Sequence, residues 1–200
     1  MSNSPKPFTG VTRRVPTALV VVAVVAFAFM NAGMDYLNDR SLQIPLFFDT
    51  IGTLVATALF GLLPGLATAI GTHIFMELIN GISGIYLPWM ACNISSALIL
   101  WILIRRNQFE SLVHALLAGL WIALANALIG AIVAATLFSG DTEHAVDFVA
   151  SALYALGNNV FSAAFLARLP VNIADKTIAV FIAFGALRLL NRGPHRRPAE

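Results

Sequence analysis

Polar and apolar positions follow one another in long blocks along this chain. Apolar stretches such as VPTALVVVAVVAFAFMNAG and SLVHALLAGLWIALANALIGAIVAATLF run for much of their length without a charged residue. A helix of about 20 apolar residues crosses the ~30 Å hydrocarbon layer of a bilayer. The stretches lack the period-two alternation of a barrel strand. The pattern therefore predicts an all-α integral membrane protein in contact with a lipid bilayer.

The blocks divide the chain into six predicted transmembrane helices. They are expected at 15–36, 48–63, 65–80, 85–104, 111–138 and 173–191. Pro64 and Gly65 are expected to form the turn between the second and third helices, because proline suits a first helical position and glycine eases chain reversal. The segment 144–168 is open to three interpretations: a span, a re-entrant hairpin broken at GNN, or a helix at the membrane interface.

The distribution of charged residues predicts on which side of the membrane each helix begins and ends. The chain is 58% hydrophobic and only 11% charged, with a net charge of +2. Basic residues cluster near the amino terminus, after the fourth predicted helix at Arg105 and Arg106, and in the last residues. The positive-inside tendency then places both termini in the cytoplasm, which requires an even number of crossings. Six crossings fit, and 144–168 is then expected to be an interfacial or re-entrant helical segment before the last helix. We expect a disordered cytoplasmic tail at 1–14, one transmembrane domain at 15–191, and a basic cytoplasmic tail at 192–200.

Several classes of function are not expected. The basic residues flank apolar blocks, so no nucleic-acid partner is predicted. A single cysteine, Cys92, excludes an intramolecular disulfide and a multi-cysteine metal site. Catalytic triads, phosphate-binding loops and zinc-protease signatures are missing from the sequence. We therefore predict no enzyme activity, no catalytic residues and no cofactor, and the incomplete pair His73 and Glu77 predicts no metal site.

Under this topology the polar groups of the helices gather in the outer half of the layer. His73, Glu77 and Asn80 lie on one helical face. A charge near the middle of a bilayer costs at least ~2.5–3.5 kcal/mol, so such groups usually face a shared cavity. The candidate substrate-binding residues are Asp49, His73, Glu77, Asn80, Tyr86, Trp89, Asn93, Asn126, Asp175 and Lys176. The alternatives are that Asp49 only caps its helix, that Asp175 and Lys176 only cap the last helix, and that Tyr86 and Trp89 are interface residues.

Two stretches carry a resemblance to a known family. IPLFFDTIGTLVATALFGLLPGLATAIGTHIFMELING and LPVNIADKTIAVFIAFGALRLL resemble the substrate-binding S components of energy-coupling factor (ECF) transporters, and the related sensor modules of some histidine kinases. In that family an Asp opens helix 2, a Gly-Pro-type turn follows it, and a DK-like pair opens the last helix. The resemblance implies a six-helix bundle in the bacterial cytoplasmic membrane that binds a vitamin or small metabolite in its outer half.

The resemblance also implies partners. S components dock on a transmembrane coupling subunit that is driven by two ATPases, all supplied by other chains. Small residues of helix 1 form the docking surface in the family, and Ala28 and Ala32 offer such a spacing here. Internal packing is the alternative role for these two alanines. The chain lacks the amino-terminal histidine arrangement of cobalt or nickel members and does not match the riboflavin, thiamin or biotin signatures, so the substrate is not predicted.

The sequence thus predicts a subunit that captures a small organic nutrient from the outer side. Lys176 is expected to contact an anionic or carbonyl group, while Asp49, Glu77 and Asp175 accept hydrogen bonds from amines or amides. Tyr86 and Trp89 are expected to stack on a ring. The loop at 38–48 is expected to open and close the site. The alternative is a ligand sensor that signals to a partner protein, and the lack of a fused output domain in this sequence favours transport.

Overall fold

The computed structural model describes residues 15–142 and 144–191, and within these ranges it is helical with no strand. The all-α prediction is confirmed. The predicted tails at 1–14 and 192–200 lie outside the described residues. The elements are α1 (Thr17–Leu37), a π-helical turn η1 (Asn38–Leu42), α2 (Ile51–Phe60), α3 (Leu62–Asn80), a 3₁₀ turn η2 (Leu87–Trp89), α4 (Met90–Arg105), α5 (Leu112–Leu137), α6 (Asp147–Ala155) and α7 (Val160–Asn191).

Four helical segments of the described chain are long and apolar enough to cross a membrane. They are Thr17–Leu42, Leu62–Asn80, Leu87–Arg105 and Leu112–Leu137. Large apolar side chains such as Val22, Phe29 and Leu120 are exposed on their outer faces, as expected of lipid-facing surfaces. These helices indicate a multi-pass membrane protein. The helix α2 has ten residues and a length of about 15 Å, half of the hydrocarbon layer.

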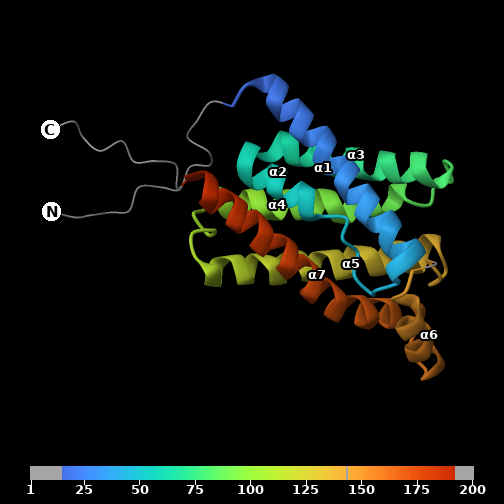
Figure 1. The fold of residues 1–200 in the computed structure, drawn as a ribbon. Coiled ribbons are helices and arrows are strands. Elements are labelled where there is room, and N and C mark those ends of the chain that lie inside the picture. Colours follow the sequence, from blue (N-terminus) through green and yellow to red (C-terminus); the bar gives the residue numbers. More distant parts are fainter. Residues whose placement is uncertain (1–14, 143, 192–200) are drawn as a thin grey trace, which may run out of the picture.

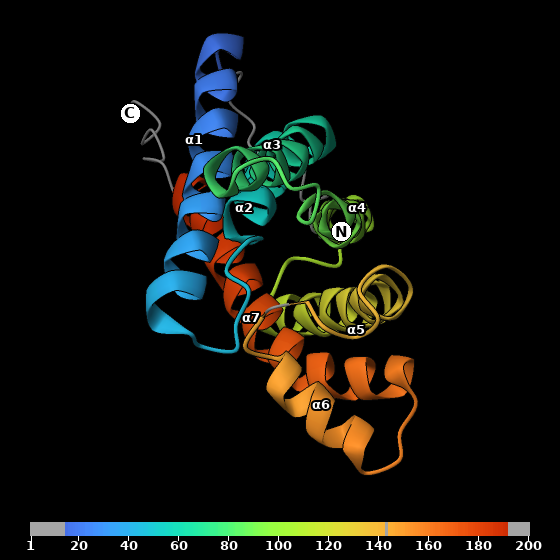
Figure 2. The ribbon, with the colours of Figure 1, turned by 90° about the vertical axis from the view of Figure 1, so that its right-hand side faces the viewer.

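The helices α1, α3, α4 and α7 lie around the short helix α2, and α5 packs against α4 and α7 (Figures 1 and 2). The start of α1 and the end of α7 lie at one end of the bundle, and α6 lies at the other (Figure 1). The helix α2 contacts α1, α3, α4 and α7, and all its residues from Ile51 to Ala58 are buried. An apolar core that includes Leu54, Leu100 and Leu187 joins α2 to α4, α5 and α7.

One buried amide connects three of these helices. The side chain of Asn31 in α1 donates to the hydroxyls of Thr53 in α2 (3.3 Å) and Thr72 in α3 (3.1 Å). Its oxygen accepts a hydrogen bond from the backbone N–H of Gly52 at 2.7 Å. Hydrogen bonds between helices hold bundles together in lipid, where apolar contact alone gives little preference for protein over lipid. Asn31 therefore fixes how α1, α2 and α3 cross.

Two predicted boundaries are wrong. The turn between α2 and α3 lies at Gly61, whose positive φ of 94° suits glycine, and not at Pro64 and Gly65. Pro64 is the third residue of α3, where a missing N–H leaves no hydrogen bond unmade. The last helix begins at Val160 instead of 173 and continues through Pro170. It packs along α5, and this packing offsets the proline penalty of about 3 kcal/mol.

The open segment 144–168 is interrupted near the predicted GNN break. Gly157 adopts a positive φ of 95°, and it separates the nine-residue α6 from the long α7. The helix α6 is about 14 Å long and cannot cross the layer alone. It contacts α7, so these two helices form a hairpin at one end of the bundle. As a consequence, Asp175 and Lys176 lie inside α7, and the interpretation of this pair as a helix cap is wrong.

The docking surface predicted at Ala28 and Ala32 is also corrected. Both side chains are buried within this chain, and Ala28 lies where α1 crosses α3 close to Gly71. A side chain that is enclosed by its own bundle cannot meet a partner without rearrangement. The alternative, internal packing, describes these two alanines.

We predict that Gly52→Ala destabilises the bundle. An added Cβ would lie 2.7 Å from both Cβ and the carbonyl oxygen of Phe27, so α1 and α2 would have to separate. Overpacking of this kind costs about 1–3 kcal/mol, and thermal unfolding in detergent should show a lower unfolding temperature. Gly33→Ala is the matched control, because nothing lies within 4 Å of its added Cβ. Equal unfolding temperatures for the two variants would contradict the close crossing.

Candidate functional site

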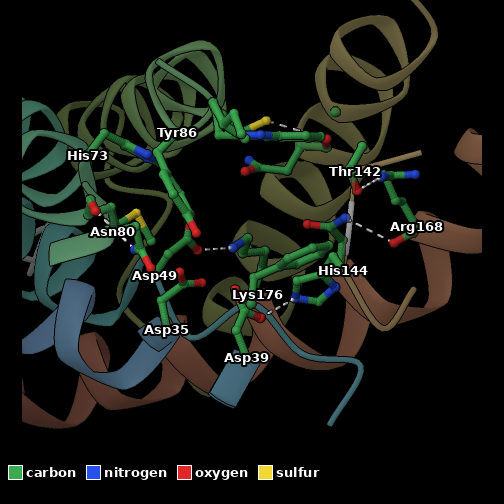
Figure 3. Close-up of a pocket in the computed structure, with 18 of the residues that line it drawn as sticks. Asp35, Asp39, Asp49, His73, Asn80, Tyr86, Thr142, His144, Arg168 and Lys176 are labelled. Carbon is green, nitrogen blue, oxygen red and sulfur yellow. Dashed lines mark hydrogen bonds and ion pairs between the residues drawn. The ribbon is translucent and has the colours of Figure 1, made fainter. Parts of the chain in front are cut away.

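A polar cavity of about 320 Å³ lies near the α6 end of the bundle (Figure 3). Its walls come from α1, the segment 39–49, α3, the α3–α4 connection, α4, α5, the α5–α6 connection and α7. This volume is at the lower end of the range for small-molecule sites, roughly 300–1,000 Å³. The lining residues include Asp35, Asp39, Arg40, Phe47, Asp49, His73, Met76, Asn80, Ile85, Tyr86, Trp89, Cys92, Asn126, Gly130, Thr142, His144, Arg168, Asn172 and Lys176.

Most of the candidate residues from the sequence line this cavity. Those on its wall are Asp49, His73, Asn80, Tyr86, Trp89, Asn126 and Lys176. The other three candidates are Glu77, Asn93 and Asp175. They do not line the cavity, and their side chains form hydrogen bonds with the backbone of segments that do. Asn93 donates to the backbone oxygen of Asp49 at 2.8 Å, and Asp175 accepts a hydrogen bond from the N–H of Phe48 at 3.1 Å.

Glu77 organises the connection between α3 and α4. Its carboxylate accepts hydrogen bonds from the backbone N–H groups of Gly84 (2.7 Å), Tyr86 (2.6 Å) and Leu87 (3.2 Å). These bonds hold the connection in the position from which Tyr86 and Trp89 reach the cavity. Glu77 therefore positions the aromatic wall, and it is not itself on that wall.

Lys176 is the centre of a buried ion cluster. Its ammonium lies 2.7 Å from Oδ2 of Asp175, 3.1 Å from Oδ1 of Asp49 and 2.7 Å from the hydroxyl of Thr50. A lysine ammonium has three N–H donors, and three acceptors surround this one. The side chain is 2% exposed. The ammonium thus donates hydrogen bonds to Asp49 and Thr50 and makes an ion contact with Asp175, so its charge is balanced within the chain.

The cluster ties α7 to the segment before α2. The Lys176 ammonium pairs with the Asp49 carboxylate, so neither charge is left alone inside the bundle. Because Asp49 and Thr50 directly precede α2, their contacts with Lys176 set the position of the start of this helix against α7.

Arg168 is the centre of a second buried cluster. Its Nη2 donates to the hydroxyl of Thr142 (2.9 Å) and to Oδ1 of Asp147 (3.1 Å). Asp147 also accepts hydrogen bonds from the backbone N–H groups of Thr142 and His144. This cluster fixes α6 and the connection before it against α7. The guanidinium lies 5.6 Å from the ring centre of Trp89, close enough for a cation–π contact.

The segment 38–48 covers one side of the cavity. Asn38 holds it through hydrogen bonds to the backbone of Ile44 and Leu46. Asp39 lies 3.6 Å from His144, and the ring of Phe47 lies 4.8 Å from the ring of His144. Burial lowers the pKa of His144, although Asp39 opposes this effect. These contacts join the segment to the α5–α6 connection across the cavity.

The sequence missed several residues of the wall. His144 and Arg168 lie in the open segment 144–168, and Asn172 directly precedes the predicted start of the last helix at 173. A signal was present nonetheless, because Arg168 and Asn172 are spaced i, i+4 and share one helical face with Asp175.

Comparison of the chain with protein-family models, with curated proteins and with solved structures finds no match. Within the described residues no group of three or more His, Cys, Asp or Glu side chains could hold a metal ion. The site must therefore be interpreted from its own chemistry. It combines charged groups of both signs with Tyr86 and Trp89 inside an apolar bundle.

We predict that Lys176→Met lowers the stability of the fold. It leaves Asp49 and Asp175 buried without a cation, and the loss of one partner of a buried ion pair costs about 3–5 kcal/mol. Thermal unfolding in detergent should show a large decrease for this variant. Arg105→Met, which removes an exposed cation from the end of α4, should change the unfolding temperature little.

A triple variant separates the charge effect from a packing effect. Lys176→Met combined with Asp49→Asn and Asp175→Asn removes the unpaired charges while it keeps similar volumes. It should recover part of the stability that Lys176→Met loses. A triple variant no more stable than the single variant would contradict the buried ion cluster.

Proposed function

We propose that this chain is a membrane-embedded substrate-binding subunit. It captures a small organic nutrient, such as a vitamin or related metabolite, from the outer side of the bacterial cytoplasmic membrane for ECF-type uptake. The single observation that carries the proposal is the polar cavity of about 320 Å³ inside an otherwise apolar helical bundle. Buried polar groups in a membrane protein are costly and usually mark a substrate or ion pathway.

The proposed orientation has both termini in the cytoplasm. The start of α1 and the end of α7 lie at the same end of the bundle, away from α6 (Figure 1). If α1, α3, α4, α5 and α7 cross the layer and α2 supplies a sixth, shorter passage, the cavity lies near the outer surface. The pair Arg105 and Arg106 then lies on the cytoplasmic side, in agreement with the positive-inside tendency.

The ligand contacts in this proposal differ in part from those expected from the sequence. Tyr86 and Trp89 offer ring surfaces, and His73, Asn80 and Asn126 offer polar groups at the wall. Lys176 stabilises the site through Asp49 and Asp175, since these two carboxylates already balance its charge. The segment 38–48 acts as the gate, because its contacts with His144 are the ones that must separate when a ligand enters from that side.

The proposed partners are an ECF coupling subunit and its ATPases. The amino-terminal part of α1 exposes Leu19, Val22 and Val25, and this apolar surface is available to lipid or to another membrane protein. We expect affinity purification of the tagged chain from its native membrane to recover ATPase and coupling subunits. Recovery of a kinase or another regulatory membrane protein in their place would favour a ligand sensor and contradict the transport role.

We predict that filling the cavity abolishes ligand capture. Gly130 lies in the cavity wall, and an added Cβ would be 3.4 Å from Cδ of Arg168, which is an ordinary contact. Gly130→Ala should therefore keep its ligand, whereas the larger side chain of Gly130→Leu would occupy the space beside Arg168. The measurement is mass spectrometry of small organic molecules released from the purified protein.

The two variants of Gly130 form a matched pair on the same helix position. The amount of released solute should be similar for wild type and Gly130→Ala, and at least about tenfold lower for Gly130→Leu, as expected for a loss of about 1.4 kcal/mol or more. An equal yield from all three proteins would show that the solute binds elsewhere and would contradict the proposed site.

A further inference from the structure

Arg168 has hydrogen-bonding capacity that the chain does not use. The side chain is 1% exposed, and Nη2 makes its two hydrogen bonds to Thr142 and Asp147. Within the described residues, Nε and Nη1 have no hydrogen-bond partner. An arginine carries five N–H groups, so three of them are unpaired. Buried donors without partners are costly, and an acceptor from a ligand in the adjoining cavity would satisfy them.

Asp35 is a buried acceptor without a partner in the described part of the chain, and so it complements the unpaired donors of Arg168. It is 7% exposed, it lies on the cavity wall, and its carboxylate forms no hydrogen bond or ion pair with any other described residue. A buried carboxylate without a partner carries a desolvation cost. The carboxylates of Asp49 and Asp175 lie nearby, and both form ion pairs with Lys176. Three carboxylates thus share one ammonium at this end of the cavity, which favours an incoming cation.

The two unsatisfied groups lie on opposite sides of the cavity (Figure 3). Asp35 is on α1 beside Asp49 and Lys176, whereas Arg168 is on α7 beside Thr142. The other charged groups of the wall already have neighbours: Asp39 faces His144, and the guanidinium of Arg40 lies over the ring of Tyr36. Among the carboxylates and guanidinium groups of the wall, Asp35 and Arg168 therefore keep groups for a ligand, and the two ring nitrogens of His73 are further wall atoms without a hydrogen-bond partner among the described residues.

We propose that the ligand is a small amine whose cationic nitrogen binds Asp35, and whose carboxylate or carbonyl oxygen accepts hydrogen bonds from Arg168. This inference rests on the proposed function, because it names the chemical class of molecule that the same cavity captures. Trp89 lines the cavity beside Arg168, so an apolar part of the ligand would contact the edge of this ring, which also stacks on Phe138. Molecules with only one of the two polar ends leave either Asp35 or Arg168 unsatisfied.

The test uses the full chain, purified in mild detergent, as wild type, Asp35→Asn and Arg168→Lys. Each variant keeps the approximate size of the side chain. Arg168→Lys also keeps a cation for Asp147 but loses the donors on Nε and Nη1. Solutes released on denaturation are identified and quantified by mass spectrometry for each mole of protein. Both variants should release at least about tenfold less of the amine than wild type, the loss expected for a charged hydrogen bond.

Matched controls lie at the opposite end of the bundle. Glu110→Gln and Arg105→Lys make the same kinds of change near the α4–α5 connection, and they should release as much amine as wild type. Thermal unfolding of each variant shows whether it has folded. If a variant does not fold, the identity of the solute from wild type decides by itself, because a solute without a basic nitrogen overturns the inference.

The possible failures are distinguishable. A solute that lacks a basic nitrogen, or an amine that Asp35→Asn retains in full, overturns this inference and leaves the proposed function standing. An amine that is lost from Asp35→Asn but retained by Arg168→Lys overturns the assignment of Arg168. A wild-type protein that releases no more organic solute than Gly130→Leu contradicts the proposed function itself.

Discussion

The rest of the structure depends on the pairing of one buried ammonium with two buried carboxylates. Lys176 joins Asp175 on its own helix to Asp49 in the segment before α2. In an apolar bundle none of these charges is tolerable alone, so the pairing fixes where α2 begins relative to α7. Asn31 then fixes α2 against α1 and α3 through neutral hydrogen bonds. Together these two sets of contacts position α1, α3 and α7, which line the cavity, against α2.

The two sides of the cavity are held with different strength: the α6–α7 side is held by several hydrogen bonds, whereas the segment 38–48 is held by fewer and weaker contacts. Arg168, Thr142 and Asp147 hold α6 against α7 with several short hydrogen bonds. By contrast, the segment 38–48 meets the α5–α6 connection through a 3.6 Å ion contact and a ring contact to His144. Exposed or partly exposed ion pairs contribute little, typically about 0–1 kcal/mol. The contacts between the segment 38–48 and His144 are therefore the ones that can be broken at a low cost in free energy.

The sequence predicts the class of fold and much of the site, but not how the polar groups pair. Block-like hydropathy is enough for an all-α membrane protein, and the depth of polar residues places His73, Asn80 and Asn126 at one cavity. Propensity alone misplaces the start of α7, because packing along α5 overrides Pro170. The roles of Lys176 and Arg168 depend on partners more than twenty residues away, which hydropathy and spacing cannot identify.

The short helix α2 has a consequence for how the chain enters the membrane. Its ten residues are too few to be recognised as an independent span during synthesis. The one-residue junction at Gly61 makes α2 and α3 a single helical hairpin, and Gly65 allows the close approach of the two helices at Thr57. In the segment before α2, the N–H of Phe48 and the carboxylate of Asp49 have their partners, Asp175 and Lys176, on α7, so this segment needs α7 in place. Biogenesis of this protein is therefore complete only when its last helix, which carries Lys176, has been inserted.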